Sequence, residues 1–336
     1  MPKSAAARPV TLHDVAREAG VSLMTASRAL SNPAVVSEAT IERVRAAVRA
    51  TGYIPNLLAG GLKSRRSMTV AGLVPIVSVP QFLPTVQALT EALDAEGYQL
   101  ILGQSGYDHA REDKLVATML GRRPDGIVVT GLVHSAQARE QLRRAGIPVV
   151  ETWDLSERPI DMLVGFSHLK VGSAVAGSFL ARGWQRLGIA TGDDERALQR
   201  RDGFLATVGR EVPTATVPAP SNLALGRRAL AELLQQDPQL RAVCCSSDGL
   251  AQGVMVEALA RGLRVPQDLA ICGFGDADFA AHLYPSLTTV HVDGPRIGRL
   301  AAQLILDRCN GRTVPQPVID LGFRIVERDS TGGAAA

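Results

Sequence analysis

Short apolar segments alternate with helical stretches along most of the chain from residue 69 onward. The first four segments are 69–75, 98–103, 125–130 and 147–152, and the stretches between them carry apolar residues at helical spacing. Strands of this apolar kind, each followed by a helix, are typical of a parallel sheet covered by helices on its faces. The pattern therefore predicts an α/β fold.

A second, similar series begins after residues 161–166. We expect helices near 169–182, 198–208, 225–235 and 250–261, and the strands of this series lie at 186–191, 215–219, 242–247 and 269–275. A last helix is expected near 295–309, and by the family resemblance given below it returns to the first series. Two tandem α/β units imply a cleft where the carboxyl ends of both sheets meet.

The N-terminal stretch "TLHDVAREAGVSLMTASRAL" has a different pattern. Two short helical segments join at Gly20, where a sharp turn is possible, and Ser22 is a good N-cap for the second. A third helix is expected over 39–51, capped by Ser37. Apolar residues at helical spacing face inward on all three: Leu12, Val15, Ala16, Ala19, Ala26, Ala29, Leu30, Ile41, Val44 and Val48. This is the pattern of a helix-turn-helix, whose second helix enters the major groove of DNA.

Charge separates the two parts of the chain. Residues 1–66 hold ten Lys or Arg and four acids, a net charge of +6, whereas the whole chain carries only +3. A small basic module ahead of a near-neutral core is typical of a protein that binds nucleic acid. A solvated basic face, or a three-helix bundle that binds protein, remains the structural alternative.

Several function classes are excluded by what the sequence lacks. The four cysteines form no CxxC pair, so we expect neither disulfides nor a metal site, and a reducing cytoplasm fits best. We expect no signal peptide and no membrane span, because three prolines interrupt the uncharged run 68–90. The dinucleotide, P-loop and G-x-S-x-G motifs are absent and the six histidines are scattered, so we expect no enzyme and no cofactor.

The segments "DVAREAGVS", "TASRAL", "VS", "RV" and "GYIPN" resemble the lactose-repressor (LacI/GalR) family of transcription regulators in order and spacing, and the similarity extends to about residue 328. The resemblance implies a periplasmic-binding-protein-like core and a homodimer on a palindromic operator of double-stranded DNA. Leu23 and Met24 would then choose operator bases, and Leu62 would open the central base step. The implied DNA contacts are Thr11, Ser22, Leu23, Met24, Thr25, Ser27, Arg28, Tyr53, Asn56 and Leu62.

The same resemblance divides the chain into segments. We expect a DNA-binding domain at 1–55, a hinge at 56–67 and a core at 68–330, followed by a tail at 331–336 without leucine heptads. Subdomain 1 would comprise about 68–165 and 294–319, and subdomain 2 about 166–293 and 320–330. Gly60 and Gly61 each cost a helix about 1 kcal/mol, so the hinge should order only when two copies meet on DNA. A plain flexible linker is the alternative.

The resemblance also implies which side chains contact a small-molecule effector in the cleft. They are Gln81, Phe82, Asp154, Phe166, Arg196, Arg200, Ser247, Asp248, Gly275 and Asp276. Many relatives carry aspartate at the position of Gly275 and asparagine at that of Ser247. Loss of a carboxylate beside several arginines favours an anionic ligand. The alternatives are a solvated helix face for the arginines, a core position for Phe82 and a turn cap for Asp276.

The chain is most similar to gluconate-type repressors, which share "GYIPN", "IPVVE" and "VGF". We therefore predict a repressor of sugar-acid metabolism genes that gluconate or 2-ketogluconate releases from its operator. The alternative function is that of a periplasmic-type binding protein without a role at DNA.

Overall fold

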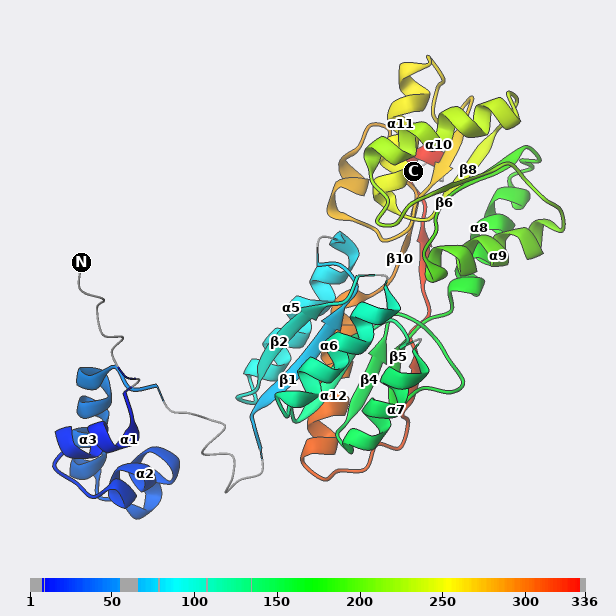
Figure 1. Cartoon of the computed structure of the whole chain (residues 1–336). Coiled ribbons are helices and arrows are strands. Elements are labelled where there is room, and N and C mark those ends of the chain that lie inside the picture. Colours follow the sequence, from blue (N-terminus) through cyan, green and yellow to red (C-terminus); the bar gives the residue numbers. More distant parts are fainter. Residues whose placement is uncertain are drawn as a thin grey trace, which may run out of the picture. The chain divides into compact units, whose positions relative to one another are not determined.

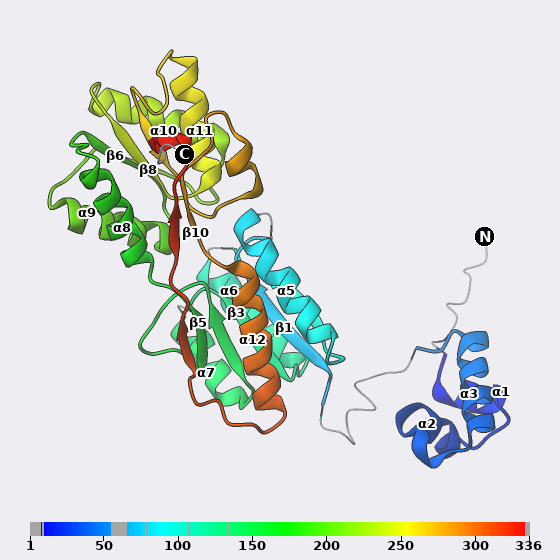
Figure 2. The same cartoon turned by 180° about the vertical axis from the view of Figure 1, so that it is seen from behind.

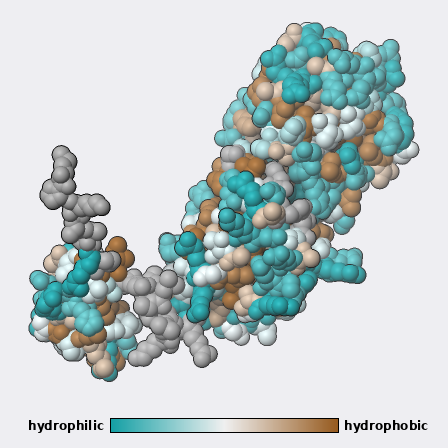
Figure 3. Space-filling view, in the orientation of Figure 1, coloured by the Kyte–Doolittle hydropathy of each residue, from teal (hydrophilic) through white to brown (hydrophobic). Residues whose placement is uncertain are grey.

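The computed structural model describes residue 8 and residues 10–54, 66–77, 79–106, 108–133 and 135–332. The chain forms two compact units, a small unit at 1–67 and a large unit at 68–336 (Figure 1). Hydrophilic and hydrophobic residues are interspersed on the face of the molecule seen in Figure 3. Among the described residues, no helix has the length and apolar character needed to cross a membrane.

The small unit contains α1 (Leu12–Glu18), α2 (Leu23–Ser31), η1 (Pro33–Val35) and α3 (Glu38–Thr51). Gly20 has φ +63° at the turn between α1 and α2, a backbone conformation that glycine adopts without strain. The three helices bury a small apolar core, whose members are Val15, Ala19, Ala29, Val44 and Ala47. The helix-turn-helix and its third helix are therefore present as predicted.

One detail of this unit differs from the prediction. Ser37 occupies the N-cap position of α3, but its side chain makes no capping hydrogen bond with the backbone. Its hydroxyl donates to Oγ1 of Thr40 at 3.0 Å instead. The backbone N–H groups at the start of α3 therefore gain nothing from the Ser37 hydroxyl.

The first sheet of the large unit has six strands in the order β11-β5-β4-β3-β1-β2, and every neighbouring pair is parallel. The strands are β1 (Thr69–Val74), β2 (Gln99–Gln104), β3 (Gly126–Thr130), β4 (Val149–Thr152), β5 (Met162–Gly165) and β11 (Val318–Asp320). Because side chains alternate along a strand, Val70 and Val128 face one helical layer while Ala71 and Ile127 face the other.

Helices cover both faces of this sheet. The helices α5 (Leu83–Asp94) and α12 (Gly294–Cys309) lie on one face, as Figure 2 shows. The helices α6 (His109–Gly121) and α7 (Ala136–Ala145) lie on the other. A Cβ at Gly298 would stand 2.3 Å from the carbonyl oxygen of Thr85, so α12 approaches α5 this closely only because a glycine lies at the crossing.

The second sheet has four parallel strands in the order β7-β6-β8-β9. They are β6 (Leu187–Gly192), β7 (Thr214–Val217), β8 (Ala242–Cys245) and β9 (Ala270–Cys272). The pair α8 (His168–Ala181) and α9 (Glu195–Val208) covers one face, and the pair α10 (Leu223–Gln236) and α11 (Asp248–Ala260) covers the other. This arrangement confirms the predicted α/β class with two tandem parallel sheets.

Three chain segments connect the two sheets. The first runs from β5 into α8, and the other two form the antiparallel ribbon of β10 (Thr289–His291) and β12 (Arg324–Val326). After β10 the chain enters α12, which returns to the first sheet as the sequence predicted (Figure 2). Short 3-10 turns complete the unit, namely η2 (Pro80–Phe82), η3 (Asp278–His282) and η4 (Asp329–Thr331).

Candidate functional site

The second helix of the small unit presents a mixed apolar and basic face. Ala26 and Ala29 are buried, while Leu23 is 39% exposed and Met24 63% exposed. Ser27 and Arg28 are also exposed. An outward methionine is costly to leave in water, yet it suits contact with thymine methyl groups in the major groove. This face has the shape and chemistry of a base-reading surface.

Two residues predicted to contact DNA also hold the N-terminus of α2. The Ser22 hydroxyl accepts a hydrogen bond from the Thr25 backbone N–H at 3.1 Å, and the two hydroxyls lie 2.8 Å apart. Ser22 therefore caps the helix, as expected of an N-cap serine. The cap fixes the end of α2 that carries Leu23 and Met24.

Thr11 occupies the N-cap position of α1, where the Asp14 carboxylate accepts its hydrogen bonds. Its backbone N–H and its hydroxyl both donate to Asp14, at 3.0 and 2.8 Å. These hydrogen bonds, followed by the charges of Arg8 and Arg17, lower the pKa of Asp14 to about 2. Tyr53 is partly buried against the core of the small unit. Asn56 and Leu62, the remaining predicted DNA contacts, lie outside the described residues.

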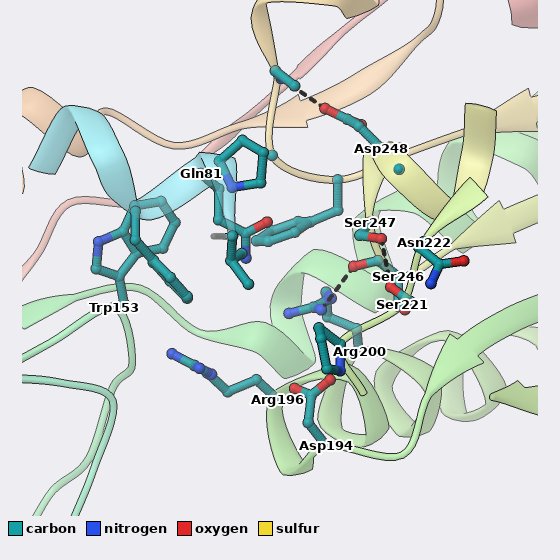
Figure 4. A pocket seen from close by; sticks show the side chains of 18 of the residues that line it. Gln81, Trp153, Asp194, Arg196, Arg200, Ser221, Asn222, Ser246, Ser247 and Asp248 are labelled. Atoms are coloured by element: carbon teal, nitrogen blue, oxygen red, sulfur yellow. Dashed lines mark hydrogen bonds between the residues drawn. The ribbon is translucent and has the colours of Figure 1, made fainter. Parts of the chain in front are cut away.

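A cavity of about 280 Å³ lies between the two sheets of the large unit (Figure 4). Its walls come from segments that follow the carboxyl ends of β1, β4, β5, β6, β7, β8 and β9. This is the cleft position that tandem parallel sheets predict. Seven of the predicted effector residues line it: Gln81, Phe82, Arg196, Arg200, Ser247, Asp248 and Gly275.

Arg200 is a buried positive charge of this pocket. Only 8% of the residue is exposed, its Nη2 donates to the Ser246 carbonyl oxygen at 2.9 Å, and its Nη1 lies 2.9 Å from Nδ1 of His168. The guanidinium carbon stands 4.1 Å from the centre of the Phe274 ring, which favours a cation over its face. Burial lowers the pKa of Arg200 to about 10, so the group is still charged at neutral pH.

Arg196 projects from the first turn of α9 toward the same pocket (Figure 4). Its guanidinium carbon lies 5.1 Å from the Phe82 ring centre, and its Nη1 is buried without a hydrogen-bond partner. Within the described part of the chain, no carboxylate forms an ion pair with Arg196 or Arg200. The alternative interpretation, that the arginines form a solvated helix face, is therefore wrong for Arg200, which is buried.

The segments that follow β7 and β8 add hydroxyls and one carboxylate to the pocket. Asp248 is 3% exposed, accepts hydrogen bonds from the Thr289 hydroxyl at 2.5 Å and the Ala277 N–H at 2.7 Å, and burial raises its pKa to about 6. The hydroxyls of Ser221 and Ser247 lie 2.8 Å apart. These groups are donors and acceptors of the kind that bind sugar hydroxyls, and they lie beside Arg200, which donates to the Ser246 carbonyl oxygen.

Gly275 lies at the rim with φ +127°, where an L residue is strained. A Cβ there would stand 3.4 Å from Oε1 of Gln81 and 3.6 Å from Oδ2 of Asp248. An aspartate at this position would place a second carboxylate beside Asp248 on a disfavoured backbone. The glycine therefore keeps the pocket free of a further negative charge.

Three predicted effector residues do not line this pocket. Asp154 lines a neighbouring cavity of about 510 Å³, with which the pocket shares Asp194 and Arg196. Phe166 is fully buried in the core against Trp153, with ring centres 6.0 Å apart.

Asp276 is engaged elsewhere. It accepts a hydrogen bond from Arg328 at 2.7 Å and lies 2.8 Å from Nδ1 of His291, at the ribbon between the sheets. This position has φ +50°, so its backbone directs the carboxylate toward β10 and β12. Both of its oxygens have partners at the ribbon, and its expected role as an effector contact stays a prediction.

Several polar and aromatic residues of the pocket were not predicted from the sequence. Each follows the end of a strand, which is the only sequence signal that points to it. Trp153 and His168 follow β4 and β5, and Asp194 caps α9 by accepting from the Ala197 N–H at 3.2 Å. The polar and aromatic lining residues that were not predicted are Trp153, His168, Asp194, Ser221, Asn222, Ser246, Phe274 and Phe279.

Known proteins match both the small unit and the large unit of the chain. The family model for bacterial regulatory proteins of the lacI family matches residues 11–56, and that for a periplasmic binding protein-like domain matches residues 176–331. The HTH-type transcriptional regulator GntR of Pseudomonas aeruginosa is 37% identical over 330 residues, covering 96% of this chain and 95% of that protein. GntR of Escherichia coli K12 is 32% identical, covering 97% and 98%.

A solved structure gives the same result. The crystal structure of a LacI-family transcriptional regulator from Silicibacter pomeroyi superposes with a TM-score of 0.91 at 34% identity, covering 96% of this chain and 99% of that one. These relatives are transcriptional regulators rather than enzymes, so the expectation of a non-enzymatic protein is confirmed. The full-length match also sets aside a binding protein without a role at DNA. The chain belongs to the LacI family of helix-turn-helix transcriptional regulators.

Proposed function

We propose that this regulator is a repressor that a small sugar acid, such as gluconate or 2-ketogluconate, releases from its operator. One observation carries the choice of ligand class. Arg200 and Arg196 bring two positive charges to the pocket, and the hydrogen-bond partners of Arg200 are a neutral imidazole and a carbonyl oxygen. Asp194 and Asp248 also line the pocket, but neither forms an ion pair with these arginines, so a ligand carboxylate would be their direct ionic partner.

The energetics favour an acid over a neutral sugar. A buried cation is costly unless an opposite charge or good hydrogen bonds compensate for its lost hydration. A hydrogen bond to a charged group contributes about 1.5 to 3 kcal/mol, which corresponds to roughly a ten- to hundredfold difference in affinity. The hydroxyls of Ser221 and Ser247 would bind the polyol part of such a ligand.

At DNA, we propose that two copies of the chain bind a palindromic operator, each placing α2 in the major groove. One recognition helix per chain reads one half-site, so a symmetric dimer gains affinity from both. Arg28 would contact bases or phosphates, and Leu23 and Met24 would select the sequence. The hinge expected at 56–67 would place Leu62 in the minor groove.

Release follows from the position of the pocket between the sheets. Gln81 and Phe82 lie in η2, beside the first sheet, and Arg200 lies on α9, beside the second. A ligand that contacts all three binds best when the two sheets move together around it. Such closure would move the first sheets of a dimer relative to each other and separate the two hinges. Coupling of this kind is typically worth 1 to 3 kcal/mol, so the ligand would weaken operator binding by about five- to 150-fold.

Titration calorimetry with gluconate, 2-ketogluconate and glucose tests the ligand class, and fluorescence anisotropy with operator DNA tests release. We expect both acids to bind at least ten times more tightly than glucose and to weaken operator binding. Tighter binding of glucose would refute the anionic ligand. Stronger operator binding in the presence of an acid would refute release in favour of co-repression.

A further inference from the structure

His168 lies between Arg200 of the pocket and the backbone of Trp153, the residue that follows β4 of the first sheet. It is the first residue of α8 and only 2% exposed. Its ring packs edge-on against Phe166, with ring centres 4.6 Å apart, and stands 6.0 Å from Phe274. Both ring nitrogens nevertheless have polar partners, so this buried histidine does more than fill space among aromatic rings.

The two partners determine where the proton resides. Nδ1 lies 2.9 Å from Nη1 of Arg200, and Nε2 lies 3.0 Å from the carbonyl oxygen of Trp153. A guanidinium only donates, so Nδ1 must accept; a carbonyl only accepts, so Nε2 must donate. The arrangement therefore requires the neutral imidazole with its proton on Nε2. Burial, together with the charges of Arg200 and Arg196, lowers the pKa of His168 well below its ordinary value.

Beyond His168, hydrogen bonds continue into the first sheet's helices. Trp153 has φ +64°, a strained conformation for a side chain of this size. Its indole Nε1 donates to the Thr85 hydroxyl at 2.9 Å, and that hydroxyl donates to the Gly294 carbonyl oxygen at 2.9 Å. Thr85 belongs to α5 and Gly294 begins α12. Arg200 lies on α9, which covers the second sheet. Hydrogen bonds made by His168 and Trp153 therefore connect it to α5 and α12 of the first sheet.

We propose that His168 is the positioning residue of the effector site: as the neutral Nε2–H imidazole, it orients Arg200 toward the ligand and ties that arginine to Trp153. This assignment rests on the proposed anionic effector. A ligand carboxylate that pulls on Arg200 would act on the Trp153 backbone through the imidazole ring. His168 itself need not touch the ligand for this effect.

A positioning role differs measurably from simple packing. If His168 acts through Arg200, its removal should weaken ligand binding only while Arg200 is present. If it only packs, its removal should weaken binding by the same factor whether or not Arg200 is present. Residues that act as one network are non-additive in this way, whereas independent residues add.

The experiment compares His168→Leu, His168→Gln, Arg200→Ala and the double variant His168→Leu with Arg200→Ala by gluconate calorimetry. Leucine fills the space but removes both hydrogen bonds, whereas the glutamine amide offers one acceptor and one donor. His282→Leu, at an exposed histidine in η3, is the matched control. Melting temperatures identify any variant that fails to fold.

We expect His168→Leu to weaken gluconate binding ten- to hundredfold and His168→Gln to restore it to within about fivefold of the parent protein. In the Arg200→Ala background, adding His168→Leu should weaken gluconate binding by less than a further threefold. Equal factors in the presence and absence of Arg200 would overturn the proposal. So would glutamine binding as poorly as leucine in a protein that remains folded.

A second measurement needs no ligand. Nitrogen-15 NMR of histidine-labelled protein, assigned with the His168→Gln variant, distinguishes the two neutral tautomers and the charged ring. We expect the Nε2–H form at pH 7; an Nδ1–H or doubly protonated ring would overturn the assignment. If the parent protein bound no sugar acid, the proposed function would fail, while the tautomer would still decide the role of His168.

Discussion

The base-reading face of α2 and the effector pocket are built in opposite ways. The first is a continuous stretch of one helix in which Leu23, Met24 and Arg28 are exposed and lie outside the buried core of the small unit. The second gathers side chains from residue 79 to residue 279, and several of them, such as Trp153 and Asp248, are almost fully buried. Recognition is therefore separable from folding on α2, whereas the two are combined in the pocket.

The difference has an energetic side. An exposed arginine on α2 remains hydrated until DNA arrives, so the free protein incurs no desolvation cost. Arg200 is already buried, its Nε has no hydrogen-bond partner, and burial works against its charge. A pocket with such a charge is organised for its ligand before the ligand binds. Mutations should accordingly change binding alone on α2 but binding and stability together in the pocket.

The largest expected effect is in the pocket. Replacing both Arg196 and Arg200 by alanine removes two charge-assisted partners and should weaken gluconate binding at least a hundredfold. Operator binding without ligand should persist, because α2 lies in the small unit. Calorimetry and anisotropy measure the two affinities separately.

Arg201→Ala on the same helix is the matched control, since its guanidinium pairs with Asp202. We expect the affinity for gluconate to stay within about threefold of the parent protein. If the double variant bound gluconate as well as Arg201→Ala does, the two pocket arginines would not determine ligand affinity. The ligand would then be held by some other part of the pocket.

On α2 we expect Arg28→Ala to weaken operator binding roughly five- to 150-fold without changing gluconate affinity. A good arginine contact to a base contributes about 1 to 3 kcal/mol. Its melting temperature should match that of the parent, because Arg28 is exposed. Arg45→Ala on α3, 60% exposed beside Glu42, provides the control. A large loss of stability in Arg28→Ala would show that recognition and folding are coupled on α2 as well.

A smaller effect is expected at Met24. Met24→Gln replaces an apolar contact by a side chain that prefers adenine, so it should change the preferred operator base by about tenfold while total affinity changes less. Selection of binding sites from a randomised operator library measures this preference. An unaltered preference would mean that Met24 does not face the bases.

The same contrast explains what the sequence could and could not predict. On α2, helical periodicity alone separates buried Ala26 and Ala29 from exposed Leu23 and Arg28, because one helix determines both sets. The alternating strands likewise predict the sheets and their cleft. Seven of the ten expected effector residues line the pocket because family spacing places them at strand ends.

The remaining pocket residues depend on geometry that periodicity does not contain. His168 and Trp153 look like ordinary core or helix-start residues in the sequence, and only the packed sheets bring them to Arg200. Asp276 shows the converse. It follows Gly275 directly, yet a left-handed backbone turns its carboxylate toward Arg328 instead of the pocket. Such choices depend on side-chain direction after a turn, which local sequence does not specify.

The smallest expected effect is a pH dependence confined to the pocket. Because burial raises the pKa of Asp248 to about 6, its carboxyl is largely ionised at pH 7.5 and largely neutral at pH 5.5, while a sugar acid keeps its charge throughout. Loss of the repelling charge should tighten gluconate binding by roughly three- to tenfold as pH falls through 6. His168, whose pKa lies well below its ordinary value, should stay neutral over this interval.

Asp248→Asn isolates this effect, since the amide is neutral at every pH and its affinity for gluconate should be nearly flat from pH 7.5 to 5.5. Melting temperature alone would be a poor measure, because the two buried groups act oppositely. The raised pKa of Asp248 favours the folded state as pH falls through 6, and the lowered pKa of His168 disfavours it as pH falls below 6.5. If gluconate binding weakened on acidification, the ligand's carboxylate would not be repelled by Asp248, and this prediction would be wrong. Operator binding by α2, which carries no group titrating in this interval, should show no matching change when ligand is absent.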